Sequence, residues 1–270
     1  MISAWLDLPA FGIFTTLCIL YYGMAFALVG LAFHSRLSAR VRSIDGLVAP
    51  FFGSVALLFG LLTGFLASDV GDRNRQAVRA VQTEAGELHN IYALSVASAS
   101  DMAEIRVALK AYVNSEVHEE WPAIMNGETS PRTDAAYDNL LREVSDPSIT
   151  RDASGAVHAA LLGAAIRAGT ARNDRLSLSG DRTNELKWIS VLLLGVIAQV
   201  GLMLVHLDKP RAMLAALTVF ATGAIVALGL IALQEHPFHG AFRVSPKPLE
   251  PLLALSDVGP NAALPSRPEK

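Results

Sequence analysis

The sequence predicts an all-α integral membrane protein with four transmembrane helices and a helical-bundle insert between the second and the third. Long runs without a charged side chain predict the membrane helices, and the concentration of charged residues in one segment, 69–187, predicts the insert. The 270 residues are 52% hydrophobic and only 17% charged, whereas an average soluble protein is about 25% charged. No strand-like alternation of apolar and polar residues interrupts this pattern.

Four runs lack Asp, Glu, Lys, Arg and His, and each is long enough for a helix across a hydrocarbon core of about 30 Å. They predict transmembrane helix 1 at 8–33, helix 2 at 46–68, helix 3 at 188–205 and helix 4 at 212–234. The first run follows Asp7 and exceeds the about 7–15 apolar residues of a secretory signal. We therefore expect it to be a retained transmembrane helix.

The insert, 69–187, is expected to be helical throughout. Apolar and small residues near its start recur at a spacing of three and four, which is typical of a helical seam: Val81, Ala85, Leu88, Tyr92 and Ser95. This seam predicts that the second transmembrane helix continues into the insert as one long helix. A second stripe from Met102 to Val117 ends at Trp121-Pro122, 135–144 forms a short helix, and a last helix starting at Val157 can continue into the third transmembrane helix.

The C-terminal segment, 235–270, is a proline-rich tail, which we expect to be irregular or disordered because proline interrupts helices. An even number of transmembrane helices places the insert and both ends of the chain on one side of the membrane. The short loops 34–46 and 206–211 are rich in Arg and Lys, and short loops of this kind stay in the cytoplasm. This charge pattern favours an extracytoplasmic insert.

Several classes of function are disfavoured by charge and motif content. The net charge of −3 without a basic stripe disfavours a nucleic-acid-binding protein, and the lone Cys18 excludes a disulfide framework. Because the four runs contain no ionisable group at neutral pH, an ion-coupled pump is disfavoured, and Gln199 is expected to hydrogen-bond to a neighbouring helix. No zinc motif, phosphate loop or nucleophile elbow occurs, so we expect neither an enzyme nor a cofactor or metal site.

The acidic residues are interpreted as surface or paired groups. Four neighbouring residues of the insert are interpreted as a solvated charged face: Glu116, His118, Glu119 and Glu120. Glu84 and Glu235 lie near the ends of apolar regions, where we expect each carboxylate to pair with a nearby arginine such as Arg79 or Arg243.

Small residues on the second and fourth transmembrane helices predict close helix packing. Gly60 and Gly64 are spaced four residues apart, as are Gly223 and Ala227. Small side chains at this spacing let two helix backbones approach closely. The contact can form within one chain or between chains.

Three apolar residues of the second transmembrane helix are candidates for a pore gate. Phe51, Val55 and Phe59 recur at every fourth position and therefore share one face. If several copies of this helix surrounded an axis, rings of these side chains would form a constriction that closes by dewetting. The alternative is that the same face packs against lipid or another helix.

Several short motifs occur in order along most of the chain, from about 10 to 250. They are Phe59-Gly60-Leu61-Leu62-Thr63-Gly64-Phe65-Leu66-Ala67, the 79–85 segment with Glu84, Tyr112, Glu120-Trp121-Pro122, Asn173-Asp174-Arg175-Leu176, and Glu235-His236-Pro237-Phe238-His239-Gly240. With them the sequence resembles the bacterial bestrophin-like membrane family, a domain of unknown function. One departure is Glu235, where the family has an aspartate.

The resemblance implies kinship with bestrophins, which are pentameric anion channels with an apolar neck on the second helix. It implies a multi-pass protein of the bacterial inner membrane that assembles as a homo-oligomer in the lipid bilayer and passes a small anion. It also implies a cytosolic middle segment, opposite to the expectation from the arginines. The acidic cluster of the calcium clasp in animal bestrophins is absent from this sequence.

Three functions stay open. The first is a homo-oligomeric anion channel with the second transmembrane helix around the pore. The alternative is a membrane-anchored sensory or protein-interaction module that acts through the helical insert. The third, an enzyme at the membrane surface, would have to use Glu84, Glu120 or Glu235.

Overall fold

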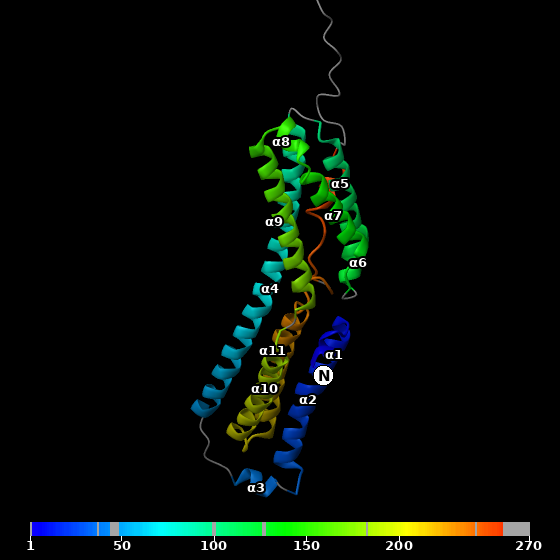
Figure 1. Ribbon diagram of the computed structural model, residues 1–270. Helices are drawn as coiled ribbons and strands as arrows, with labels where there is room; N and C mark the ends of the chain where they lie inside the picture. The colour runs from blue at the N-terminus through cyan, green and yellow to red at the C-terminus, as the bar shows by residue number, and fades with distance from the viewer. Residues whose placement is uncertain are drawn as a thin grey trace, which may run out of the picture. The chain divides into compact units, whose positions relative to one another are not determined.

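The structure, a computed structural model, describes residues 2–36, 38–43, 49–98, 101–125, 128–181, 183–240 and 242–255; the side chains at 42, 49–51 and 152 lie outside this description. Helices make up most of it, and no strand occurs within those ranges (Figure 1). Four helices are long and apolar enough to cross a membrane. The predicted all-α membrane fold is thereby confirmed.

The chain divides into two compact units. Unit 1 comprises 1–73, 182–236 and 240–243, and unit 2 comprises 74–181, 237–239 and 244–270. The helices of unit 1 are α1 (Ile2–Leu6), α2 (Ala10–Phe33), α3 (Ser38–Arg42), the first part of α4 (Ala49–Ala97), α10 (Glu185–Val205) and α11 (Pro210–Ala232). Those of unit 2 are the rest of α4, α5 (Ala103–Ser115), the π-helical turn η1 (Glu116–Glu120), α6 (Trp121–Ile124), α7 (Pro131–Val144), α8 (Ser148–Asp152), α9 (Gly155–Gly180) and α12 (Glu250–Leu253).

Within unit 1, α2, α10 and α11 pack against one another. Two glycines allow this close approach: a Cβ on Gly195 would lie 2.3 Å from the hydroxyl of Tyr21, and a Cβ on Gly229 would lie 2.3 Å from the ring of Phe14. Gln199 is buried on α10, and its Nε2 donates a hydrogen bond to the Tyr21 carbonyl of α2 at 3.0 Å. The expected contact of Gln199 with a neighbouring helix is therefore confirmed.

The glycines singled out in the sequence do not serve this packing within the chain. Gly60, Gly64 and Gly223 are exposed, and a Cβ on any of them would have no neighbouring atom within 4 Å among the described residues. Ala227, the partner of Gly223 in the motif, is half-buried. Close packing through these residues between chains stays a prediction.

Unit 2 is a bundle in which α4, α5, α7 and α9 surround one apolar core (Figure 1). The predicted seam is confirmed, since Val81, Ala85 and Leu88 are buried in this core. The long helix is also confirmed, because α4 runs without a break from Ala49 to Ala97. Ser130 begins α7, where its side chain accepts a hydrogen bond from the Thr133 amide, a normal helix cap.

Two helix ends differ from the expectation. The helical stripe does not stop at Trp121-Pro122; it passes through the π-helical turn η1 and ends after Ile124. Pro122 has no N–H to donate to a carbonyl one turn earlier, which suits a position next to a widened turn. The last insert helix, α9, ends at Gly180 and does not continue into the third transmembrane helix, because the Asn184 side chain caps α10 through the Leu186 amide at 2.9 Å.

The described part of the C-terminal segment is mostly irregular, as expected, but several of its side chains pack in the core of unit 2. Phe238, Leu249 and Leu252 are buried in the unit 2 core. Gly240 has a φ of +79°, a backbone conformation that glycine adopts without strain. The expectation of disorder is therefore wrong for 237–240 and 242–255, because apolar side chains between the prolines reach a core; 241 and 256–270 lie outside the described residues.

Candidate functional site

The membrane part of α4 is the least covered of the four candidate transmembrane helices. Within this chain 17% of its most apolar window is buried, against 28% to 44% in the other three. Leu57, Leu61 and Phe65 are 72%, 51% and 60% exposed. Because they recur at every fourth position, they form one apolar stripe along α4.

The face predicted from the sequence lies elsewhere on the same helix. Val55 and Phe59 are half-buried, and the Phe59 ring lies 5.4 Å from the ring of Phe220 on α11. The side chain of Phe51 lies outside the described residues. Within one chain, the face with Phe59 therefore contributes to helix packing, and the stripe of Leu57, Leu61 and Phe65 is left uncovered.

Glu235 is the centre of a polar cluster in unit 1. Its carboxylate is fully buried and accepts hydrogen bonds from the Thr183 amide at 2.7 Å, from Trp188 Nε1 at 3.2 Å and from Arg73 Nη2 at 2.6 Å. Arg73, rather than the Arg243 expected from the sequence, is thus its ion-pair partner. These contacts tie the end of α11 to α4 and to the start of α10.

A second buried cluster lies in unit 2 around Arg175 of α9. The Nε of Arg175 donates to Glu84 Oε2 at 2.9 Å, and the Tyr112 hydroxyl donates to Glu84 Oε1 at 2.7 Å. Glu84, Tyr112 and Arg175 are each fully buried. The expected pairing of Glu84 with Arg79 is wrong, because Glu84 faces the core while Arg79 lies on the exposed side of α4.

Glu116 and Glu120 belong to the same cluster. Arg175 Nη2 donates to Glu116 Oε1 and to Glu120 Oε2, both at 2.8 Å, and Arg172 Nε donates to Glu120 Oε2 at 3.0 Å. Both carboxylates are fully buried. The interpretation of this stretch as a solvated face is therefore wrong for these two residues.

The sequence held a signal for this correction. Tyr112, Glu116 and Glu120 are spaced four residues apart, so the two glutamates continue the apolar stripe that faces the core. Glu119 lies off this stripe, is partly exposed and pairs with the exposed Arg132 at 3.0 Å. Only this outer part of the stretch is a charged surface.

The electrostatics of the cluster are dominated by burial. Burial, together with the negative charge of Glu84, raises the pKa of Glu116 well above its ordinary value of 4.5, although Arg175 acts in the opposite direction. Burial also raises the pKa of Tyr112, so its hydroxyl stays protonated and donates to Glu84. In this cluster the carboxylates of Glu84, Glu116 and Glu120 all accept hydrogen bonds from the permanently charged guanidinium of Arg175.

Several residues of the sequence motifs meet beside this cluster. The Trp121 ring lies 4.9 Å from the Arg175 guanidinium and 6.0 Å from the Phe238 ring, which it meets edge-on. Pro122 follows Trp121 in the first turn of α6. Glu84, Glu120, Trp121 and Phe238 are therefore parts of one core in unit 2, whereas Glu235 belongs to unit 1.

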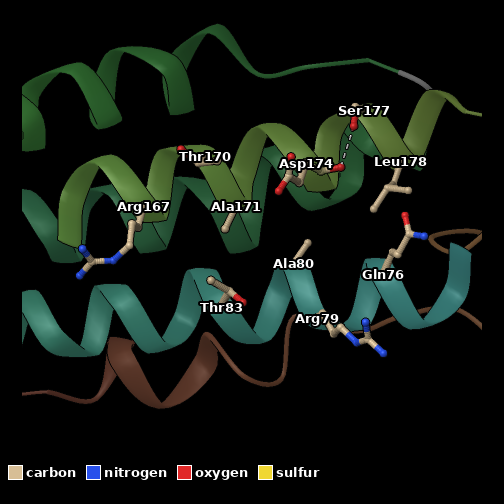
Figure 2. A pocket seen from close by; sticks show the side chains of 10 residues that line it. All are labelled: Gln76, Arg79, Ala80, Thr83, Arg167, Thr170, Ala171, Asp174, Ser177 and Leu178. Carbon is tan, nitrogen blue, oxygen red and sulfur yellow. Dashed lines mark hydrogen bonds between the residues drawn. The ribbon is translucent and has the colours of Figure 1, made fainter. Parts of the chain in front are cut away.

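An open groove of about 530 Å³ runs between α4 and α9 in unit 2 (Figure 2). Ala80 and Ala171 line it and point toward each other between the two helices, and Arg79 and Asp174 are among its polar lining residues (Figure 2). Arg167, at one end, is held by Glu87 through two hydrogen bonds of 2.8 and 2.9 Å. Among the described residues no three His, Cys, Asp or Glu side chains are grouped so that they could hold a metal ion.

The long apolar helices and the helical bundle define a multi-pass helical membrane protein. A family model described as the Bestrophin-like domain matches residues 19–249, and the chain therefore belongs to the Bestrophin-like family. The comparison with curated proteins gave no match.

Solved structures share the fold. A membrane protein variant has a TM-score of 0.66 at 12% identity, covering 89% of this chain and 96% of its own. A variant of a bacterial bestrophin homologue from Klebsiella pneumoniae has a TM-score of 0.64 at 14% identity, covering 91% and 94%. Another crystal structure of the Klebsiella pneumoniae homologue has a TM-score of 0.61 at 13% identity, covering 90% and 94%.

Proposed function

We propose that this protein is a homo-oligomeric channel of the bacterial inner membrane in which α4 lines the pore. The observation that carries the proposal is the uncovered stripe of Leu57, Leu61 and Phe65 on a transmembrane helix. Copies of α4 around an axis would turn this stripe into stacked apolar rings, which exclude water when the pore narrows. A small anion is the proposed permeant ion, in keeping with the kinship to bestrophins that the family name implies.

Assembly is the first requirement of this proposal. The exposed Gly60 and Gly64 support it, since they would let a neighbouring helix approach α4 closely. We expect the detergent-solubilised protein to have a discrete mass of several chains by light scattering, after the detergent contribution is subtracted. A monomer or dimer would contradict the proposal, because so few copies of α4 cannot enclose a pore.

The position of the neck is tested by bilayer recordings under a chloride gradient. Leu61→Ala and Phe65→Ala are expected to raise conductance several-fold, because each shortens the side chains of one ring. Phe59→Ala serves as the matched control on the half-buried face beside Phe220. A rise with Phe59→Ala alone would instead support the neck of Phe51, Val55 and Phe59, and unchanged currents in all three variants would contradict a neck on α4.

The proposed orientation places the insert outside the cytoplasm, on the strength of Arg and Lys in the short loops. Ser43→Cys in a short loop and Asn90→Cys in the insert are introduced separately in a Cys18→Ser background. Labelling with a membrane-impermeant maleimide in intact spheroplasts shows which of the two positions lies outside the cytoplasm. Labelling at Asn90 alone is the expected result. Labelling at Ser43 alone would establish the opposite orientation, the one that kinship with bestrophins implies.

A second candidate function is a membrane-anchored sensory or protein-interaction module. The open groove between α4 and α9 favours it, because the groove offers both a guanidinium and a carboxylate to a partner. Capture of a partner by the full-length protein, lost on Arg79→Ala together with Asp174→Ala, would support this function. Recovery of the same partner by the double variant would contradict it.

A further inference from the structure

The cluster around Arg175 in unit 2 holds more buried negative than buried positive charge. Three carboxylates are fully buried there, those of Glu84, Glu116 and Glu120, and the guanidiniums of Arg172 and Arg175 are their buried ion-pair partners. Arg172 is in addition shared with Asp134, which is itself largely exposed. With every group ionised, the three buried glutamates exceed the two arginines by one negative charge.

A buried charge without a counter-charge raises the free energy of the folded protein. Moving a carboxylate from water into a low-dielectric interior costs several kcal/mol even after relaxation, so a buried carboxyl without its own counter-charge takes up a proton instead. The hydrogen bonds show which carboxyl lacks a counter-charge. Both oxygens of Glu84 and both oxygens of Glu120 accept from donors.

Glu116 is the exception. Its Oε1 accepts only from Arg175 Nη2, which also serves Glu120, and its Oε2 accepts from no donor although it is buried. The π-helical turn places the Glu116 carboxyl in the core, close enough to Glu84 of α4 for their negative charges to repel each other. A proton on Glu116 would remove the excess charge and would let the carboxyl donate a hydrogen bond to Glu84.

We propose that Glu116 is a buried proton-binding site, occupied at neutral pH, that holds η1 and α4 together through a carboxyl–carboxylate pair with Glu84. The charged and titratable groups that face this site come from four elements: Glu84 of α4, Tyr112 of α5, Glu120 of η1, and Arg172 and Arg175 of α9. Asp134 of α7 contacts Arg172 behind them. The site is independent of the proposed channel function.

The sign of the pH dependence follows from the raised pKa of Glu116. In the unfolded chain the carboxyl titrates near its ordinary value, whereas in the folded protein it keeps its proton to higher pH. Its contribution to stability is complete below the unfolded pKa and is lost as the pH rises through the folded pKa. The insert is therefore expected to loosen at alkaline pH, in contrast to proteins whose paired carboxylates make them weaken in acid.

Infrared spectroscopy of the full-length protein in detergent tests the site directly. At neutral pH the wild type is expected to show the C=O stretch of a protonated carboxylic acid, and Glu116→Gln is expected to lose it. Glu119→Gln is the matched control, because Glu119 lies in the same turn and is paired at the surface. Absence of the band from the wild type, or its persistence in Glu116→Gln, would overturn the proposal.

Thermal unfolding between about pH 6 and about pH 10 supplies the second measurement. As the pH rises across this range, the melting temperatures of the wild type and of Glu119→Gln are expected to fall. The melting temperature of Glu116→Gln is expected to fall less, because glutamine mimics the protonated acid. An equal fall in all three proteins would overturn the proposal. If Glu116→Gln does not fold, the infrared band of the wild type and its loss at high pH decide the question.

Discussion

At the scale of single residues, Arg175 is the side chain that links the buried carboxylates of unit 2. It is the common ion-pair partner of Glu84, Glu116 and Glu120 and packs on the Trp121 ring. A buried ion pair adds little stability compared with apolar residues of the same volume, because desolvation offsets the attraction. Removing one partner is different, since the remaining charges stay buried without compensation.

Arg175→Met is accordingly expected to destabilise the protein by about 3–5 kcal/mol. Arg167→Met is the matched control on the same helix, because Arg167 is exposed and its pair with the half-buried Glu87 is expected to contribute only about 0–1 kcal/mol. Tryptophan fluorescence during chemical unfolding measures both. Equal effects of the two substitutions would show that the Arg175 cluster is not a buried unit.

At the scale of elements, α2 and α11 pack closely because their surfaces are complementary as well as apolar. Gly229 of α11 provides the space that the Phe14 ring of α2 occupies. Tyr22 of α2 and Thr222 of α11 add a hydrogen bond of 2.9 Å between their hydroxyls. Helices in a membrane gain their stability from such close contacts, because lipid is as apolar as the side chains.

Gly229→Ala is therefore expected to cost about 1–3 kcal/mol, since the new methyl group would lie 2.3 Å from the Phe14 ring. Gly223→Ala, on the same helix, places its methyl group where no atom of the described residues lies within 4 Å and should not lower stability. The melting temperature of the two variants in one detergent distinguishes them. A similar loss in both would contradict the role of the Phe14 contact, because alanine forms helices more readily than glycine at either position.

At the scale of the whole molecule, the proposed assembly would decide what the exposed face of α4 does. A stripe that includes Leu57 at 72% and Phe65 at 60% exposure can face lipid, a pore or a second chain. Gly64 lies beside this stripe, and a Cβ added to it would have no atom of the described residues within 4 Å. A larger side chain at Gly64 should therefore affect contacts between chains without disturbing the fold of one chain.

Gly64→Leu is expected to reduce the mass of the assembly while leaving the melting temperature of the dissociated chain unchanged. Gly23→Leu is the matched control, because Gly23 of α2 is also exposed and a Cβ added to it would meet no described atom within 4 Å. Light scattering of both variants gives the result. An unchanged mass for Gly64→Leu would place the contact between chains on another face.

The sequence determined the four transmembrane helices, the long α4 and the helical insert. These features are local, because a helix satisfies its own backbone hydrogen bonds and an apolar run of sufficient length must enter the membrane. The seam through Val81 and Leu88 followed for the same reason, as helical periodicity alone assigns the buried face. The family resemblance was also present in the order of short motifs, and the match over residues 19–249 confirms it.

Only the tertiary structure decided which charges are buried and with which partners. Arg175 meets Glu84 across 91 residues of sequence, and Arg73 meets Glu235 across 162, so no local spacing links them. For the same reason the nearby Arg79 and Arg243 were wrong choices of partner. The exposed face of α4 likewise depends on where Phe220 packs, and that is a property of the folded helices rather than of any one run of residues.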